Sequence, residues 1–301
     1  MSPQEILNEL ISIEREKIDD GDKAGNLLAA LNSQLAEMPA IDIFTLVHNS
    51  RDIEDDEGYW ACIHHLRGRP EDAVFEKCCA WANDISIDRR QAAADILAQL
   101  GWALEYPFAQ RSLPILSKLL DDSELDVVTS TLYAFGHLKI GEPKQLAIFI
   151  SHHDHEVRCA TASAMGGRED SVSVVGMIKL SRDSDRDVRN WATFYLNWLD
   201  EVENPEIDNA LFERLSETDA EIRGEALIGL AKRHNMLVLE PLKTELAGEF
   251  HGAWSIEAAM ELMSPELYPL LTNLRGRFSD TDRSAFGDEL EQAITACAAT
   301  H

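Results

Sequence analysis

Residues 185–196 read DRDVRNWATFYL. An aspartate begins the stretch, a second acid follows two positions later, and Arg189 comes two positions after that, before small and apolar residues at helical spacing. The first aspartate suits a helix N-cap, where a short oxygen-bearing side chain accepts from an orphan backbone N–H. The second acid suits the positive end of the helix dipole. The stretch therefore predicts the start of an amphipathic helix.

The same pattern recurs along the chain. Clear copies begin at Asp154 (DHEVRCATASAMG) and Asp219 (DAEIRGEALIGL), and weaker ones at Ser86 (SIDRRQAAADIL) and Glu124 (ELDVVTSTLYAF). Periods of 30 to 38 residues separate the marker positions, which are Arg90, Val128, Arg158, Arg189, Arg223 and Ser255. Such periods are typical of stacked helical hairpins. We expect Ser86 and the leading aspartates to be N-caps, and each marker arginine to reach an acid of a neighbouring repeat, forming a ladder.

A second apolar segment precedes each of these helices. Examples are LPILSKLL from Leu113, KQLAIFIS from Lys144 and SVVGMIKLS from Ser173. Several begin at or near a proline, whose missing N–H costs little at a helix start. No alternating, strand-like segment competes. We therefore predict an all-α fold, a right-handed α-solenoid of about seven to eight A/B hairpins over residues 41–301, with residues 1–40 as an N-terminal helical cap.

The register D-x-[DE]-[VI]-R-x-x-A resembles HEAT repeats of the phycobilisome-lyase-like type. The run DVRNWATFYLNW (187–198), followed by EIRGEALIGLAKR (221–233), is similar to small bacterial HEAT-repeat proteins, some of which are encoded beside Rhs-type toxins. The resemblance covers about residues 41–301. It implies that the second helix of each hairpin, the B helix, lines a concave surface. It implies little about function, because repeats of this kind serve many roles.

The position of each side chain around the B helix indicates which aromatic residues are core. At 100° per residue, Val188, Ala192, Leu196 and Leu199 fall on one face, which we expect to be buried. Trp191 lies at its margin and Tyr195 flanks it. The predicted partner-binding residues on the concave face are Trp198, Phe194, Trp191, Asn190, Tyr133, His137, Asp95, Gln99, Ile228 and Met260. The alternative is that neighbouring helices cover these side chains.

Charge restricts the partner classes. The 301 residues include 27 Lys and Arg against 54 Asp and Glu, a net charge of −27. Such a surface repels nucleic-acid phosphates and anionic membranes and speeds encounter with cationic partners. We find no apolar run of the length that a membrane span needs, and the acidic start does not look like a signal peptide. The five cysteines lack the paired spacings of a disulfide framework or a zinc site. A cytoplasmic location is expected.

Catalytic signatures are weak. His152, His153 and His155 form the best metal-like cluster, but Asp154 and Glu156 beside them already have structural roles at a helix start, and no matching cluster occurs elsewhere. We find no P-loop, no G-x-S-x-G and no G-x-G-x-x-G. We expect no catalytic residue, no cofactor and no metal.

The combination favours a non-catalytic protein-binding scaffold. Its most concrete form is a cytoplasmic immunity protein, whose acidic concave face captures a basic toxin domain and blocks the toxin's active site. Two alternatives stay open. One is a HEAT-type enzyme, either DNA glycosylase-like or bilin lyase-like, although a glycosylase needs a basic groove that the net charge of −27 contradicts. The other is a general assembly scaffold with an unrelated partner.

Overall fold

The computed structural model describes residues 1–15, 21–50, 57–249 and 252–298. Over these ranges the chain forms helices joined by short turns, and it contains no β-strand. The all-α prediction is confirmed. None of the described helices combines the length and the apolar character that crossing a membrane would need. The chain divides into two compact units, residues 1–142 and residues 143–301.

The first unit is a stack of four helical hairpins. Its elements are α1 (Pro3–Arg15), α2 (Gly21–Glu37), α3 (Ala40–Asn49), α4 (Glu57–Arg67), α5 (Asp72–Trp81), α6 (Ile87–Gln99), the 3-10 helix η1 (Trp102–Leu104), α7 (Ala109–Leu119) and α8 (Leu125–Leu138). Helix α1 contacts α3, and α2 contacts α4, so the first hairpin packs on the second one. Residues 1–40 contain the helices α1 and α2, and their role as an N-terminal cap stays a prediction.

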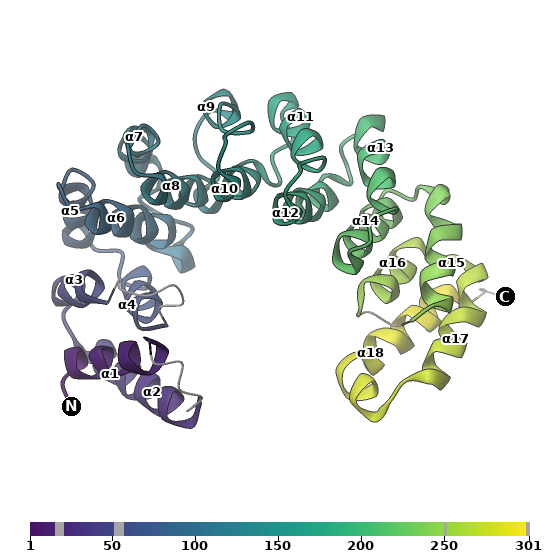
Figure 1. Ribbon diagram of the computed structural model, residues 1–301, viewed down its shortest axis with the longest axis horizontal. Coiled ribbons are helices and arrows are strands. Elements are labelled where there is room, and N and C mark those ends of the chain that lie inside the picture. The colour runs from purple at the N-terminus through teal and green to yellow at the C-terminus, as the bar shows by residue number, and fades with distance from the viewer. Residues whose placement is uncertain (16–20, 51–56, 250–251, 299–301) are drawn as a thin grey trace. The chain divides into compact units, whose positions relative to one another are not determined.

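The second unit continues the hairpin pattern. Its elements are α9 (Pro143–Ala147), α10 (His155–Met165), α11 (Ser171–Leu180), α12 (Arg186–Leu196), η2 (Asn197–Leu199), α13 (Pro205–Arg214), α14 (Ala220–Lys232), η3 (Met236–Val238), α15 (Leu239–Ala247), α16 (Trp254–Leu262), η4 (Pro265–Leu267), α17 (Tyr268–Arg277) and α18 (Asp280–Cys297). Within this unit the odd-numbered A helices form one layer and the even-numbered B helices form the other (Figure 1).

The core of the second unit lies between its two layers. The stripe predicted for α12 is buried, since Val188, Ala192 and Leu196 have no exposed surface and Leu199 has 1%. Burying an aliphatic side chain of this size contributes about 1.5–3 kcal/mol relative to leaving it exposed. Helix α12 also contacts the B helices on both sides of it, α10 and α14, as well as the A helices α11 and α13. These four neighbours leave only a narrow strip of α12 free.

The marker arginines form a ladder between repeats, as expected, but not with the second-position acids of the B helices that the pattern pointed to. Arg158 donates from Nε and Nη2 to the two carboxylate oxygens of Asp183, both at 2.8 Å. Arg90 pairs with Asp122, Arg189 with Glu217 and Arg223 with Glu245. Each acid belongs to the next A helix or to the turn that follows it, rather than to the first turn of a B helix. The ladder thus ties each hairpin to the one after it.

Each of these arginines also closes its own hairpin. The Nη1 atom of Arg189 donates to the backbone carbonyls of Asp183 and Ser184, at 3.0 and 3.1 Å. The equivalent atoms of Arg90, Arg158 and Arg223 donate to the matching pairs of turn carbonyls. Backbone carbonyls need hydrogen-bond donors. One guanidinium per repeat therefore donates to the carbonyls of its own A-to-B turn and also to an acid of the next hairpin.

Three of the four predicted N-caps are confirmed. Asp154, Asp185 and Asp219 each accept hydrogen bonds from two backbone N–H groups of the following helical turn. The prediction for Ser86 is wrong, since its side chain makes no cap hydrogen bond. The carboxylate of Asp84 instead accepts from the Ser86 backbone N–H at 3.0 Å. The polar contact of this turn thus lies before the helix.

Helix α9 is shorter than its sequence predicts. The apolar run from Lys144 predicts a helix through Ser151, but the helix ends at Ala147 after five residues. Residues 148–150 form a turn. They are Ile148, Phe149 and Ile150, and β-branched and aromatic residues are poor helix formers. The A layer is therefore only half as long at this hairpin as it is at α11, which has ten residues.

Candidate functional site

Four aromatic side chains of α12 and η2 form one continuous cluster, which we call the ring cluster: Trp191, Phe194, Tyr195 and Trp198. The Phe194 ring lies 5.3 Å from that of Trp198 and 5.2 Å from that of Tyr195, both in edge-to-face contacts. Trp191 lies 5.8 Å from Phe194 and 6.1 Å from Tyr195. Aromatic pairs at such distances stabilise each other by about 0.5–1.5 kcal/mol beyond the area that they bury. The rings therefore hold one another in place.

The two tryptophans are the exposed part of the ring cluster. Trp191 has 46% of its surface exposed and Trp198 has 49%, whereas Phe194 and Tyr195 are half-buried beside them. Large apolar side chains that gather on a surface commonly mark an interaction site. Tryptophan is also among the residue types that dominate binding energy at protein interfaces. The strip of α12 that its neighbours leave free is thus occupied by indole rings.

The preceding B helix provides a seat for this cluster. A Cβ atom at Gly166 would lie 2.3 Å from Cδ1 of Tyr195, so only glycine admits the ring at this point. The Tyr195 hydroxyl bonds to Oγ of Ser163, one turn earlier on α10, at 3.3 Å. The tyrosine thereby joins α10 to α12 and supports the tryptophans from below.

The following B helix fixes the other end of the cluster. The carboxylate of Glu225 on α14 accepts from Nδ2 of Asn197 at 2.7 Å and from Nε1 of Trp254 at 3.1 Å. Burial raises the pKa of the Glu225 carboxyl above its ordinary value. This one carboxylate joins η2, α14 and α16, directly beneath the turn that carries Trp198.

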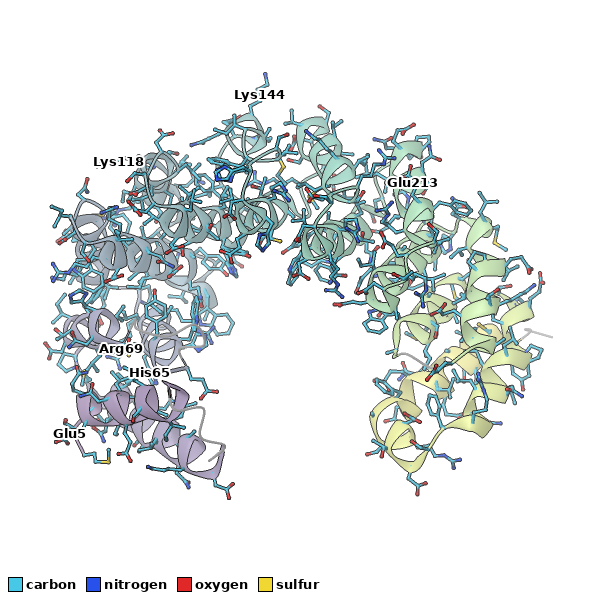
Figure 2. All side chains as sticks on the ribbon, viewed as in Figure 1. Glu5, His65, Arg69, Lys118, Lys144 and Glu213 are labelled. Atoms are coloured by element: carbon cyan, nitrogen blue, oxygen red, sulfur yellow. The ribbon has the colours of Figure 1, made fainter. Side chains whose placement is uncertain are left out.

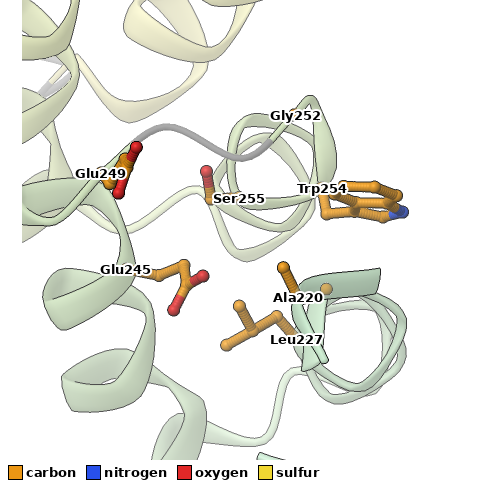
Figure 3. A pocket seen from close by; sticks show the side chains of 8 residues that line it. Ala220, Leu227, Glu245, Glu249, Gly252, Trp254 and Ser255 are labelled. Carbon is orange, nitrogen blue, oxygen red and sulfur yellow. The ribbon is translucent and has the colours of Figure 1, made fainter. Parts of the chain in front are cut away.

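A small cavity lies next to this bridge. Its lining includes Leu227, Glu245, Trp254 and Ser255, and Figure 3 shows these side chains around it. Its volume of about 10 Å³ corresponds to roughly one water molecule. The space is therefore too small for an organic substrate.

Acidic residues follow the ring cluster in the chain. Asp200, Glu201 and Glu203 are exposed, and they form no ion pair within the described ranges. By contrast, Arg186, Arg189 and most other cations of this unit bond to carboxylates. The uncompensated charge next to Trp198 is therefore negative, and it would attract a positively charged partner.

The ten predicted partner-binding residues divide into three groups. Trp191, Trp198, Tyr133 and His137 are exposed. Phe194, Gln99 and Met260 are half-buried. Asp95, Asn190 and Ile228 are buried, with 8%, 9% and 3% of their surfaces exposed, so the prediction that they are accessible is wrong. Tyr133, His137, Asp95 and Gln99 belong to the first unit, and the other six belong to the second unit.

Neighbouring B helices explain the three errors. Asp95 on α6 accepts a hydrogen bond of 2.6 Å from the hydroxyl of Tyr59, which lies on α4. Helix α14 contacts both α12 and α16, and these contacts cover Ile228. Asn190 is covered on α12, and its Oδ1 has no partner among the described atoms. A face that points away from the A layer is still flanked on both sides, which the turn angle of a single helix does not reveal.

Sequence reasoning did not assign the supporting residues Gly166, Ser163, Glu225 and Trp254 to the site. Gly166 was interpretable only as a helix terminus, since nothing local indicates a tyrosine from the next repeat. These residues could have been found by aligning the repeats with one another. In such an alignment Ser163 and Gly166 of α10 lie about one repeat before Tyr195.

The histidine group makes structural contacts. Nδ1 of His152 accepts from the backbone N–H of Asp154 at 3.2 Å, and its ring lies 4.3 Å from that of His153. Among the described residues, no group of three or more His, Cys, Asp or Glu side chains is arranged to hold a metal ion.

Comparison with known proteins supports the fold and leaves the activity open. No protein-family model matches the chain. Protein YibA of Escherichia coli strain K12 and that of strain O157:H7 are each 35% identical over 144 residues, which is 48% of this chain and 50% of each relative. The match thus spans about half the length of these curated relatives.

Solved structures show the same architecture. The X-ray structure of Escherichia coli YibA matches with a TM-score of 0.66 and 26% identity, covering 89% of this chain and 96% of that one. Kap121p matches with a TM-score of 0.61 and 12% identity over 89% of this chain and 35% of its own. The complex of CpcE and CpcF of phycocyanin lyase from Nostoc sp. PCC7120 is more distant, at a TM-score of 0.46 and 15% identity, with 85% and 94% covered. The chain has the stacked helical-hairpin fold of YibA and Kap121p.

Proposed function

We propose that this protein is a non-catalytic scaffold that binds a basic protein through the ring cluster, and that its partner is a toxin domain that it neutralises. The observation that carries the proposal is the pair of half-exposed tryptophans, Trp191 and Trp198, in a cluster that contacts α10 through Tyr195 and whose neighbour Asn197 bonds to α14. Rigid aromatic side chains lose little conformational entropy when they bind, which favours affinity.

Charge supports the basic character of the partner. The chain carries a net charge of −27, and the exposed acids Asp200, Glu201 and Glu203 follow Trp198 directly. Negative charge at the edge of an interface accelerates association with a cationic protein, whereas buried apolar contacts slow its dissociation. Lysine or arginine side chains of the partner can also stack on the exposed indole faces, which contributes about 0.5–2 kcal/mol.

The immunity role is supported in addition by the resemblance of the sequence to HEAT-repeat proteins encoded beside Rhs-type toxins. Neutralisation requires only that the complex covers the toxin's active site, so it needs no chemistry from this chain. We expect this protein to bind the toxin domain in the cytoplasm. The same surface would serve a general assembly scaffold, and inhibition of the partner separates the two roles.

The experiment uses the full chain and the purified domain of any toxin gene that lies next to its own gene. We expect nanomolar binding by biolayer interferometry and loss of toxin activity at equimolar ratio. Trp198→Ala and Trp191→Ala should each weaken binding by about 10- to 100-fold, as hot-spot truncations do. The matched control is Phe212→Ala, because Phe212 is equally exposed at 47% but lies on the A helix α13.

Three outcomes decide the proposal. Binding with inhibition, lost in the tryptophan variants and kept in the control, supports it in full. Binding without inhibition supports the scaffold and rejects the immunity role. Equal binding by Trp198→Ala and the wild type rejects the ring cluster as the contact surface.

A further inference from the structure

An apolar surface on the opposite layer of the second unit is separate from the ring cluster. It is a cleft of about 400 Å³ between α9 and α11, lined chiefly by Ala147, Ile150, Val172, Val175 and Lys179. A second cleft of about 490 Å³ shares Ile150, Val175 and Lys179 and continues toward the end of α11. We call this combined surface the α9–α11 cleft.

The short helix α9 explains why the cleft is open. After five residues α9 gives way to a turn, so the second half of the A helix that would cover α11 is missing. Val175, in the middle of α11, keeps 64% of its surface exposed, and Ile148, in the turn, keeps 69%. Aliphatic side chains with this exposure are usually covered in a hairpin stack, where neighbouring A helices pack side by side.

The charge of the cleft differs from that of the rest of the chain. Acids outnumber bases by 54 to 27 overall, yet none of the residues that line the 400 Å³ cleft is acidic. In the 490 Å³ cleft, Asp183 is bonded to Arg158 and Arg182 to Glu213, so both charges are already compensated.

Lys179 is the charge that remains. Its ammonium bonds to the Ser151 hydroxyl at 2.5 Å and to no carboxylate in the described structure. Lys144 projects from α9 into solvent (Figure 2). An apolar floor beside an ammonium group that lacks a counter-ion matches a segment that is apolar and acidic.

We propose that the α9–α11 cleft binds an acidic amphipathic peptide segment of a second partner protein, which places aliphatic side chains against Val175 and Ile150 and a carboxylate beside Lys179. Alternating apolar and anionic groups on one short segment satisfy both features, as in groove-bound helices. This inference does not depend on the proposed function, since it concerns another layer, another charge and another partner.

The test selects ligands from a displayed library of random twelve-residue peptides, with the immobilised full chain as target. Free Val175→Asp protein in excess removes peptides that bind elsewhere, including basic ones attracted by the net charge. We expect the surviving peptides to combine Leu, Ile or Phe with Asp or Glu at helical spacing. Their affinity, measured by fluorescence anisotropy, should fall at least tenfold in Lys179→Glu and in Val175→Asp.

The matched control is Lys118→Glu. Lys118 is also an exposed A-helix lysine bonded to a neutral group, Oδ1 of Asn83, but it lines a polar cleft that contains Asp121 and Asp122. Its replacement should leave peptide affinity unchanged. Melting curves by circular dichroism verify that each variant is folded. Ile148→Asp is a second variant in which an acid replaces an exposed apolar residue.

Several results would overturn the inference. They are a selection that yields no peptide, surviving peptides without acidic residues, and equal affinity for wild type and Lys179→Glu. Sedimentation adds a further one: if the wild type is a dimer that Val175→Asp dissociates, a second copy of the chain covers the cleft instead. Binding of vesicles of anionic lipid through Val175 would likewise reject a peptide partner.

Discussion

Two arginine–glutamate pairs with the same chemistry and different burial make the ladder testable. Arg189 donates to Glu217 at 3.0 and 3.4 Å, and to two turn carbonyls at 3.0 and 3.1 Å. Arg182 donates to Glu213 at 2.7 and 2.9 Å, so its bonds are shorter. The side chains of the first pair are 19% and 17% exposed, whereas those of the second are 39% and 44% exposed.

Burial, rather than distance, should decide what each pair contributes. Replacing Arg189 with Met keeps the apolar stem but removes one of the two cationic partners of Glu217, since Arg214 stays 3.2 Å away, and it removes the donor of two turn carbonyls. Leaving such acceptors without this donor should cost about 1–3 kcal/mol. Replacing Arg182 with Met should cost about 0.2–1 kcal/mol, since exposed pairs are screened by solvent.

Urea denaturation followed by far-UV circular dichroism measures both variants. At about 2–4 °C per kcal/mol for a unit of this size, Arg189→Met should also lower the melting temperature by roughly 2–12 °C. Repeat proteins can unfold in steps, so the denaturant slopes must agree with that of the wild type before free energies are compared. Equal costs for Arg189→Met and Arg182→Met, or a larger cost for Arg182→Met, would refute the reasoning.

Three further substitutions test the packing, the buried carboxylate and the caps. Gly224→Ala should cost about 1–3 kcal/mol, because its Cβ would lie 2.4 Å from a neighbouring tryptophan ring, whereas Gly276→Ala meets nothing within 4 Å and should be neutral or stabilising in the same melting experiment. Since burial raises the pKa of Glu225, native protein takes up a proton at a higher pH than the unfolded chain does. The free energy of unfolding of the wild type, relative to that of Glu225→Gln, should therefore increase as the pH falls through the raised pKa, and that contribution should disappear above it; a pH-independent difference contradicts this. Asp154→Ala should cost about 1 kcal/mol in urea titrations, since it removes two cap bonds, and Ser86→Ala should cost only a few tenths; similar losses for both would reject the cap assignment.

The sequence predicted those features that depend on local chemistry. The helix phase identified Val188 and Leu196 as core, and the aspartate positions identified three N-caps. The spacing of Arg158 and Arg189 predicted a ladder, because a repeat places equivalent side chains at equivalent points of every hairpin. Periodicity is enough for such features.

Features that depend on the neighbouring repeat could not be predicted in this way. Asn190 and Ile228 point away from the A layer but are covered by adjacent B helices. The early end of α9 depends on the free-energy difference between a helical and a turn conformation of Ile148 and its neighbours. The sequence pattern does not reveal that difference. Of the two rings expected to be most exposed, Trp198 has 49% of its surface exposed, whereas Phe194 is half-buried by the rings beside it.

The glycine seat beneath Tyr195 has a consequence for how this surface can change. An aromatic ring enters only where the preceding repeat has given up its own side chain, as Gly166 has done, and the same arrangement joins Gly224 to Trp254. Each glycine and the aromatic residue that packs on it are thus interdependent, although they lie about thirty positions apart in the chain. A redesign toward a new partner would have to replace the glycine and the aromatic residue together. Among related sequences, the two positions should covary.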